Sequence, residues 1–160
     1  MSDTFYVIFK IDQQTFAVRL DDVHRIVRVV HITPMPEAPK VIEGVINVQG
    51  DVIPVVNMRT RFRMDERDLT LDDQILLIRS NQHILGLLVD EVVDIIESDS
   101  DQIVSQQTIL PGAERIRGVM KKDEDMILIQ DIETLLSADE EKKLEISLKK
   151  KSRTGKSRGK

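Results

Sequence analysis

An internal repeat constrains the fold of this chain more than any other feature of its sequence. When each residue is placed beside the one 69 positions later, pairs of matching type follow in order, and after a shift to 74 positions the match resumes. The pairs that a richness in aliphatic residues does not explain are Gln13/Gln82, Ala17/Gly86, Asp21/Asp90, Gly44/Gly118 and Asp51/Asp125. The repeat predicts two copies of one five-stranded unit, with matching segments 5–58 and 74–132.

The apolar residues favour strands. The chain has 19 Ile and 17 Val, but only 4 Phe, 1 Tyr and no Trp. β-branched side chains suit pleated sheets, and short runs bounded by turn residues read as strands. The clearest runs are Phe5–Ile11, Phe16–Leu20, Val52–Met58, Ile75–Ile78 and Ile84–Val89. Units this small bury their sheet edges best by curling into barrels. We therefore expect a mainly β protein, with two barrels side by side and a binding groove at their junction. Val41–Gly44 reads as a helical turn.

The end of the chain has a different character. Ile132, Leu135 and Leu136 share one helical face, and Ser137 with Glu140 fits a capping box. The pattern predicts a short exposed helix over 138–148. Residues 149–160 hold seven of the 23 basic residues and no acidic one, which predicts a disordered tail. The remaining residues carry 16 basic and 28 acidic groups, a net charge of about −12. Such a body repels nucleic acid, so no nucleic-acid partner is expected; a nucleic-acid-binding tail would show affinity that falls steeply with salt.

No constellation of residues suited to catalysis or metal binding is evident. The absence of cysteine excludes thiolate chemistry, cysteine-ligated metals and disulfides. The three histidines, His24, His31 and His83, lack the spacing of metal ligands. The acidic run 97–101 lacks the glycine and final glutamate of a calcium loop. Neither a phosphate-binding loop nor a nucleophile elbow is present. We expect no enzyme activity, no catalytic residue, no metal and no cofactor. The first ten residues lack a signal-peptide pattern, and no 18-residue apolar stretch occurs.

The segment Gly44–Arg59 identifies a family. Gly50 after Asn47 indicates a hairpin turn, and Pro54 fits only an edge or the start of a strand. The segment resembles G-V-x-N-x-R-G-x-x-x-P-V-x-x-x-R, the signature of CheW-like domains, with Gln49 at the arginine position. Further matching blocks are Phe16-Ala17, Ile32–Pro36, Gly86–Val92, Gly118-Val119 and Gln130–Leu136. The resemblance spans residues 5–137 and defines a CheW-like domain over 1–137.

The resemblance implies both a fold and a function. Its fold is two intertwined five-stranded SH3-like barrels with a short C-terminal helix. CheW-like adaptors are non-catalytic scaffolds of two-component signal transduction in chemotaxis. They bind the cytoplasmic tips of chemoreceptors, which are helical hairpins, and the regulatory domain of the histidine kinase CheA, itself CheW-like. Other CheW-like domains are further partners. The expected location is the cytoplasm, at membrane-bound receptor arrays and in contact with the membrane only through receptors.

The resemblance also implies site residues. The receptor-binding positions are Val23, Arg25, Ile26, Val27 and Gln49, and the structural motif consists of Gly44, Asn47, Gly50, Pro54, Gly86 and Gly118. Two positions depart from the family pattern. The family commonly has arginine where this chain has Gln49, and an acidic residue where it has Arg25. We hypothesise that Arg25 carries the charge complementarity to the receptor, with Gln49 adding neutral hydrogen bonds or serving only as a surface residue. Val23, Ile26 and Val27 fit either plain core or a groove lining.

Two other functions fit the same scaffold. One is an adaptor of a paralogous, non-chemotaxis chemosensory pathway, which the two charge departures would suit. The other is a small-ligand-binding double barrel, which needs an enclosed cavity of several hundred Å³. The sequence does not indicate which receptors, which kinase or which oligomeric state is involved.

Overall fold

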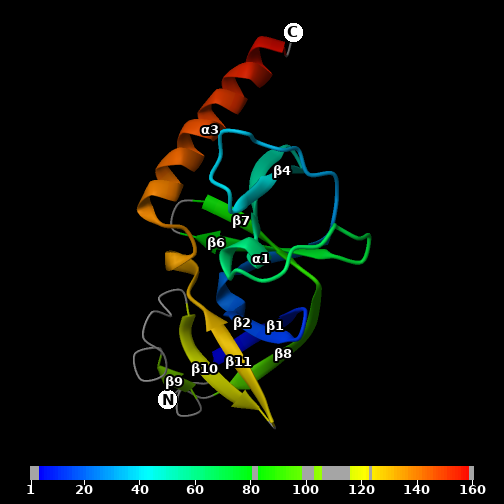
Figure 1. Ribbon diagram of the computed structural model, residues 1–160, viewed down its shortest axis with the longest axis vertical. Helices are drawn as coiled ribbons and strands as arrows, with labels where there is room; N and C mark the ends of the chain where they lie inside the picture. Colours follow the sequence, from blue (N-terminus) through cyan, green and yellow to red (C-terminus); the bar gives the residue numbers. More distant parts are fainter. Residues whose placement is uncertain (1–3, 81–82, 99–102, 106–115, 123, 159–160) are drawn as a thin grey trace.

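The computed structural model describes residues 4–80, 83–98, 103–105, 116–122 and 124–158. One sheet contains β1 (Thr4–Ile11), β2 (Gln14–Arg19), β8 (Glu91–Ser98), β9 (Ile103–Ser105), β10 (Ile116–Lys122) and β11 (Asp125–Gln130). The other contains β3 (Val23–Arg28), β4 (Ile42–Val48), β5 (Asp51–Asn57), β6 (Gln74–Ser80) and β7 (His83–Val89). The described helices are η1 (Leu20–Asp22), α1 (Met58–Arg61), η3 (Ile132–Thr134) and α3 (Ala138–Arg158). Figure 1 shows the two sheets as two lobes stacked along the long axis.

The two lobes exchange strands. The first sheet has the order β8-β1-β2-β11-β10-β9, and the second has β3-β6-β7-β5-β4. The repeat makes β1 to β5 equivalent to β6, β7, β8, β10 and β11, so both sheets have the same order, apart from the three-residue β9 at one edge. Each barrel is therefore built from strands of both copies. The predicted fold of two intertwined, mainly β barrels of the SH3-like kind is confirmed.

The equivalence extends to individual irregularities. The pairing of β4 with β5 shifts register between Ile42 and Gly44, and that of β10 with β11 shifts between Ile116 and Gly118, 74 positions later. The parallel pairs also correspond, since Val55 faces Gly86 in one sheet and Ile129 faces Ala17 in the other. Bulges at matching positions bend both sheets in the same way.

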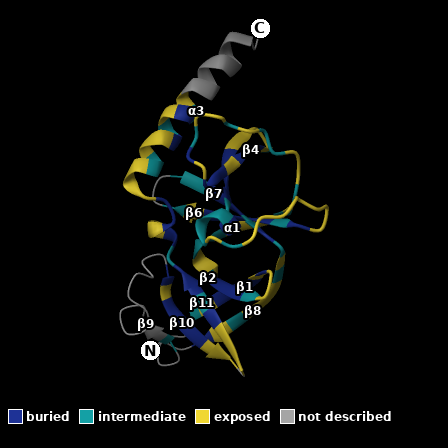
Figure 2. Ribbon diagram, viewed as in Figure 1, coloured by how far each residue is buried: buried dark blue, intermediate teal, exposed yellow. Residues whose placement is uncertain are grey.

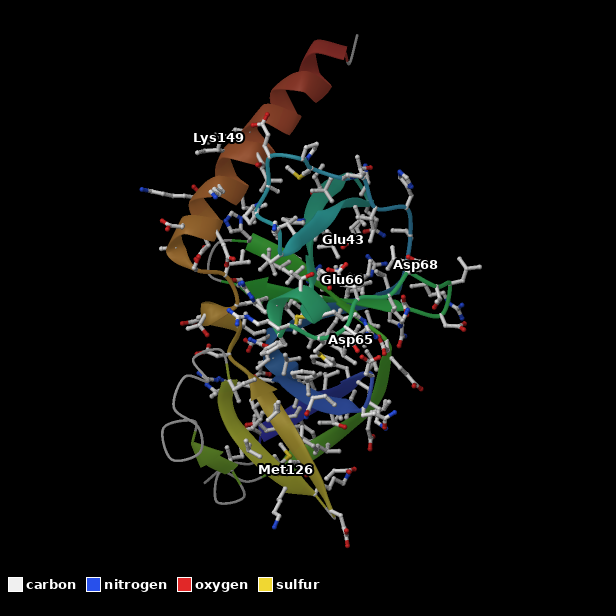
Figure 3. The ribbon with its side chains drawn as sticks, in the orientation of Figure 1. Glu43, Asp65, Glu66, Asp68, Met126 and Lys149 are labelled. Carbon is white, nitrogen blue, oxygen red and sulfur yellow. The ribbon has the colours of Figure 1, made fainter. Side chains whose placement is uncertain are left out.

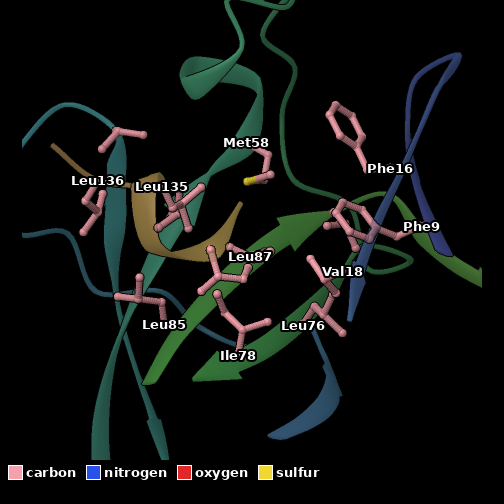
Figure 4. Packing of buried hydrophobic residues seen from close by; sticks show 14 of the residues in the cluster. Phe9, Phe16, Val18, Met58, Leu76, Ile78, Leu85, Leu87, Leu135 and Leu136 are labelled. Atoms are coloured by element: carbon pink, nitrogen blue, oxygen red, sulfur yellow. The ribbon is translucent and has the colours of Figure 1, made fainter. Parts of the chain in front are cut away.

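Three hydrophobic clusters make the core. Tyr6, Ile8, Ala17, Met120, Ile127 and Ile129 fill the first barrel, and Ile46, Ile53, Val55, Ile75 and Leu77 fill the second. A larger cluster lies between the barrels and includes Phe9, Phe16, Met58, Leu76 and Leu87 (Figure 4). The Phe9 and Phe16 rings stack at 5.6 Å. The junction between the barrels is thus largely packed with side chains, and only its rims are open to a partner.

One local expectation was wrong: Val41–Gly44 does not form a helical turn, because Ile42 already begins β4. The expected C-terminal helix is present as α3, but it is not exposed throughout, because Leu144 is fully buried in the shared core with Leu148 packed beside it. The backbone of α3 is helical from Ala138 to Arg158. Figure 2 shows the start of α3 partly buried against the body, and Figure 1 shows its end projecting beyond it.

Candidate functional site

The receptor-binding residues expected on one strand lie on β3, an edge strand of the second sheet that pairs only with β6 among the described strands. Val23 packs against the shared core and Val27 against the core of the second barrel. Arg25 is exposed, and Ile26 is 39% exposed. The strand therefore combines the two alternatives, core and groove lining. Val23 and Val27 belong mainly to the core, while Arg25 and Ile26 are available to a partner.

Gln49 lies at a hairpin tip at the end of β4. Gln49 and Gly50 both have positive φ, 53° and 92°, and they connect the paired residues Val48 and Asp51. This is the two-residue turn whose twist matches that of the flanking strands. Asn47 Oδ1 accepts a hydrogen bond of 2.9 Å from the Gly50 amide. The turn exposes the Gln49 side chain on a defined backbone, and Val48 beside it packs against the same cluster as Val27.

The remaining motif residues have structural roles. A Cβ on Gly44 would collide with the carbonyl oxygen of Thr33, whose backbone exchanges two 2.8 Å hydrogen bonds with Val45 and so joins the segment after β3 to β4. A Cβ on Gly86 would lie 2.7 Å from Ile75 Cγ2. Pro54 sits opposite Val45, just before β5 begins its parallel pairing with β7 at Val55. Gly118 marks the register shift in β10.

An ionic cluster that the sequence did not predict connects the two barrels. Arg59 on α1 is only 8% exposed. Its guanidinium donates to Asp12 Oδ2 at 2.7 Å and to both carboxylate oxygens of Asp90 at 2.7 and 2.9 Å. Arg67 bonds Asp73 Oδ1 at 2.7 Å and Asp90 Oδ1 at 2.8 Å. Asp12 belongs to the β1–β2 turn of the first barrel, so these bonds connect it to α1, which follows the second.

The cluster pairs two arginines with three aspartates. Hydrogen bonding from Arg59 holds the pKa of Asp12 below its usual value. Burial would raise the pKa of Asp73, but the bonds from Arg67 and from the Thr70 backbone outweigh burial, so this pKa is lowered. Hydrogen bonding to Asp12 and Asp90 raises the pKa of Arg59. Asp12, Asp73 and Arg59 therefore stay charged near neutral pH, which suits ion pairs that stabilise the fold and not a catalytic acid or base. The signals in the sequence were Arg59 at the end of the signature and Asp90 in the repeat.

The opposite end of the molecule, on the first barrel, also exposes apolar side chains. Ile95 is 52% exposed and Met126 is 54% exposed. Figure 3 shows Met126 near the tip of the β10–β11 hairpin. The same barrel has an open cleft of about 170 Å³, lined by Ile8, Ile96 and Ile127 together with polar residues that include Lys10, Asp94 and Lys122. By the repeat, Ile95 is equivalent to Ile26, so the two barrels present related faces.

The described clefts do not favour the small-ligand alternative. Besides the 170 Å³ cleft, a cleft of about 20 Å³ lies at the ionic cluster, and another of about 70 Å³ lies among Arg19, Arg79 and Arg117. Pockets for small organic ligands hold roughly 300–1,000 Å³. Within the described residues, no three histidine or acidic side chains gather as metal ligands, and no helix has the length and apolar content to cross a membrane.

A duplicated pair of strand-exchanged barrels that displays apolar and charged faces, with an ionic cluster that joins the two barrels, defines a protein-binding scaffold. Comparison with known proteins gives the same answer. The CheW-like domain matches residues 6–140, and the chain belongs to this family of chemotaxis scaffold proteins.

Individual relatives agree. A probable chemotaxis protein CheW of Rhizobium etli is 32% identical over 140 residues, covering 86% of this chain and 90% of the relative. The chemotaxis protein CheW of Treponema pallidum is 28% identical over 144 residues, covering 86% and 85%. The crystal structure of the scaffolding protein TtCheW from Thermoanaerobacter tengcongensis superposes with a TM-score of 0.79 at 29% identity, covering 88% and 92%.

Proposed function

We propose that this chain couples the cytoplasmic tip of a chemoreceptor to the regulatory domain of the histidine kinase CheA, in the cytoplasm at a membrane-bound receptor array. The observation that carries the proposal is the pair of related but distinct exposed faces, one on each barrel, in a member of the CheW-like family. An adaptor needs two such faces, because one partner must not displace the other.

The receptor face is β3 with the neighbouring hairpin tip. A helical hairpin presents an amphipathic ridge, which docks against apolar side chains bordered by charge. Ile26 supplies the apolar contact, Arg25 the cation, and Gln49 a neutral hydrogen-bonding group. The departures at Arg25 and Gln49 then select a receptor whose acidic groups lie opposite Arg25.

The kinase face is the end of the first barrel. Ile95 and Met126 are more than half exposed there, and a cleft of about 170 Å³ on the same barrel is large enough to receive a side chain. A CheW-like kinase domain offers a barrel end of like shape, and so would another CheW-like domain. Each contact can be weak, because an array multiplies such contacts through effective concentration.

Binding titrations with separate partners test the proposal. The receptor probe is the cytoplasmic hairpin of a chemoreceptor from the same cell, and the kinase probe is the regulatory domain of its CheA. Arg25→Glu should weaken receptor binding roughly tenfold or more and leave kinase binding unchanged, because it opposes charge at one face only. Ile95→Asp should do the reverse. A wild-type chain that binds neither probe would refute the coupling role.

The pathway that the adaptor serves depends on its partners. A pull-down from the native cell, read for a receptor and a histidine kinase, separates a chemotaxis adaptor from one of a paralogous pathway. A Gln49→Arg variant that gains affinity for the receptor would support the comparison with the family pattern.

A further inference from the structure

One rim of the junction between the barrels holds three arginines, of which only Arg19 has an ion pair within the described residues. Arg19 ends β2, Arg79 lies on β6, and Arg117 lies on β10, and all three line the cleft of about 70 Å³. They come from both barrels and from both copies of the repeat. Their convergence is therefore a property of the folded chain and not of any local motif.

Within the described part of the chain, these arginines make few hydrogen bonds. The Nε of Arg19 is buried and has no hydrogen-bond partner, and its one ion pair within the described part of the chain is a 3.9 Å contact with the highly exposed Asp21. Arg79 lies 3.0 Å from His24 Nδ1, which accepts a hydrogen bond when the imidazole is neutral. Among the described residues, Arg117 has no ion pair. Guanidinium groups each carry five donors, so the cleft holds a surplus of donors.

Three carboxylates, those of Asp22, Asp131 and Glu133, also line the cleft. Across the described residues none of them lies within ion-pair distance of the three arginines. Asp131 instead caps η3, where its Oδ1 accepts a hydrogen bond from the Glu133 amide at 3.1 Å. The lining thus has no net charge, yet its cations remain available to an incoming acid.

The equivalent cleft at the other rim of the junction has arginines that are paired within the chain. The repeat makes Asn57 and Leu88 there equivalent to Asp131 and Arg19 here. At that rim Arg67, Leu69 and Asp73 of the segment 63–73 line the cleft, which holds only about 20 Å³. Arg59 and Arg67 there form ion pairs with aspartates of the same chain. On the arginine side no such segment of the described chain supplies the anions.

The cleft borders the receptor face. Asp22 immediately precedes Val23 at the start of β3, and Val23 pairs with Ile78, the neighbour of Arg79. A helix docked along β3 would therefore bring side chains to the mouth of the cleft.

We infer that Arg19, Arg79 and Arg117 accept an acidic side chain of the chemoreceptor hairpin, and so supply the cationic contact that Gln49 does not. The inference rests on the proposed receptor role of β3. Arginine suits this task because its planar donors match a carboxylate in bidentate geometry. The rest of the body, which is strongly acidic, would otherwise repel an acidic helix.

The test compares the double variant Arg79→Gln/Arg117→Gln with the wild type in titrations of the receptor's cytoplasmic hairpin. Both side chains are exposed, so the variant should fold, which thermal unfolding checks. We expect its dissociation constant to rise roughly ten- to hundredfold, with a weaker dependence on salt, and its affinity for the kinase domain to stay unchanged. The matched control Lys142→Gln/Lys143→Gln removes the same charge from exposed positions of α3 and should bind the receptor as the wild type does.

Charge exchange identifies the partner group. Arg79→Glu should bind poorly to the native receptor hairpin and regain affinity for a hairpin in which the opposing acidic residue is lysine. Wild-type binding with an unaffected double variant would overturn the inference while the proposed function stands. A wild type that does not bind the receptor at all would overturn both. Inorganic phosphate is the competing oxyanion; calorimetric phosphate binding that the double variant loses, with receptor affinity unchanged, would make this a free-phosphate site and also overturn the inference.

Discussion

At the scale of single residues, Arg59 connects the β1–β2 turn, the segment after β5 and the end of β7 through Asp12, Asp65 and Asp90. Its replacement would leave Asp12 without its ion-pair partner and Asp90 with Arg67 alone. We expect Arg59→Ala to lower the free energy of unfolding by about 2–4 kcal/mol, measured by urea denaturation. The exposed Arg28→Ala should change it by less than about 0.5 kcal/mol. Equal effects of the two changes would contradict the stabilising role of Arg59.

Gly86 shows how the two barrels differ inside a shared pattern. Its equivalent, Ala17, tolerates a methyl group, but a Cβ at Gly86 would lie 2.7 Å from Ile75 Cγ2. Gly86→Ala should therefore destabilise the protein by about 1–3 kcal/mol through overpacking, measured as a lower urea midpoint. Adding Ile75→Ala should cost less in the Gly86→Ala background than in the wild type. Strictly additive effects would show that the predicted clash is absent.

The predictability of these residues follows from how local their interactions are. The Asn47–Gly50 turn could be predicted, because its hydrogen bond spans three residues and its positive φ angles favour glycine. The bonds of Arg59 span 47 and 31 residues, so only the fold reveals them. Arg79 and Arg117 carried no signal, since nothing in their neighbourhoods marks two exposed arginines as facing one cleft.

At the scale of elements, the start of α3 is held by a capping box and an ion pair. Ser137 and Glu140 exchange hydrogen bonds of 2.8 and 3.1 Å, and Arg61 donates to Glu140 at 2.7 and 2.9 Å. The Arg61 hydrogen bonds are the main reason that the pKa of Glu140 falls from 4.5 to about 2. A depressed folded-state pKa contributes stability above the unfolded-state pKa, and this contribution is lost as pH falls.

We therefore expect stability to decline between about pH 4.5 and pH 2, in part through Glu140. Glu140→Gln should lower the free energy of unfolding at neutral pH by about 1–3 kcal/mol and flatten its decline across that interval. Urea unfolding at several pH values measures both. The lowered pKa values of Asp12 and Asp73 act in the same direction, so the decline should be reduced in the variant and not abolished. If the free energy of unfolding depended on pH equally in the variant and the wild type, Glu140 would not contribute to the decline.

The two parts of α3 should differ in what they contribute. Leu144 and Leu148 pack on the shared core, while the sequence after Leu148 contains no apolar side chain. Truncation after Leu148 should leave the free energy of unfolding within about 0.5 kcal/mol of the full chain. Truncation after Ser137 should lower the free energy of unfolding several times more than truncation after Leu148, because it removes Leu144 and leaves Arg61 without Glu140. The capping box predicted where this helix begins; its burial depends on the core that other segments form, which no helix pattern contains.

At the scale of the whole molecule, the repeat predicted two equivalent units but not their exchange of strands. The alternation of apolar and polar residues predicts which face of a strand is buried, but it does not predict which strand pairs with it. Here β1 and β2 pair with strands of the second copy, in both the β1–β8 and β2–β11 contacts. The two barrels therefore do not correspond to the two copies of the repeat, and neither copy contains a complete barrel.

This arrangement leads to a prediction about a split protein. Fragments 1–68 and 69–160 each contain strands of both barrels, and each would expose half of the shared core that includes Phe16 and Leu76. Each fragment alone should be unfolded by circular dichroism, and an equimolar mixture should recover the β spectrum and unfold in one transition. The cut lies in the loop between the two copies of the repeat. Arg67 and Asp73 are on opposite sides of the cut, so their ion pair forms only when the two fragments associate. A fragment that folds alone would mean that its barrel can close without the exchanged strands, and that the two faces of the adaptor do not depend on one common core.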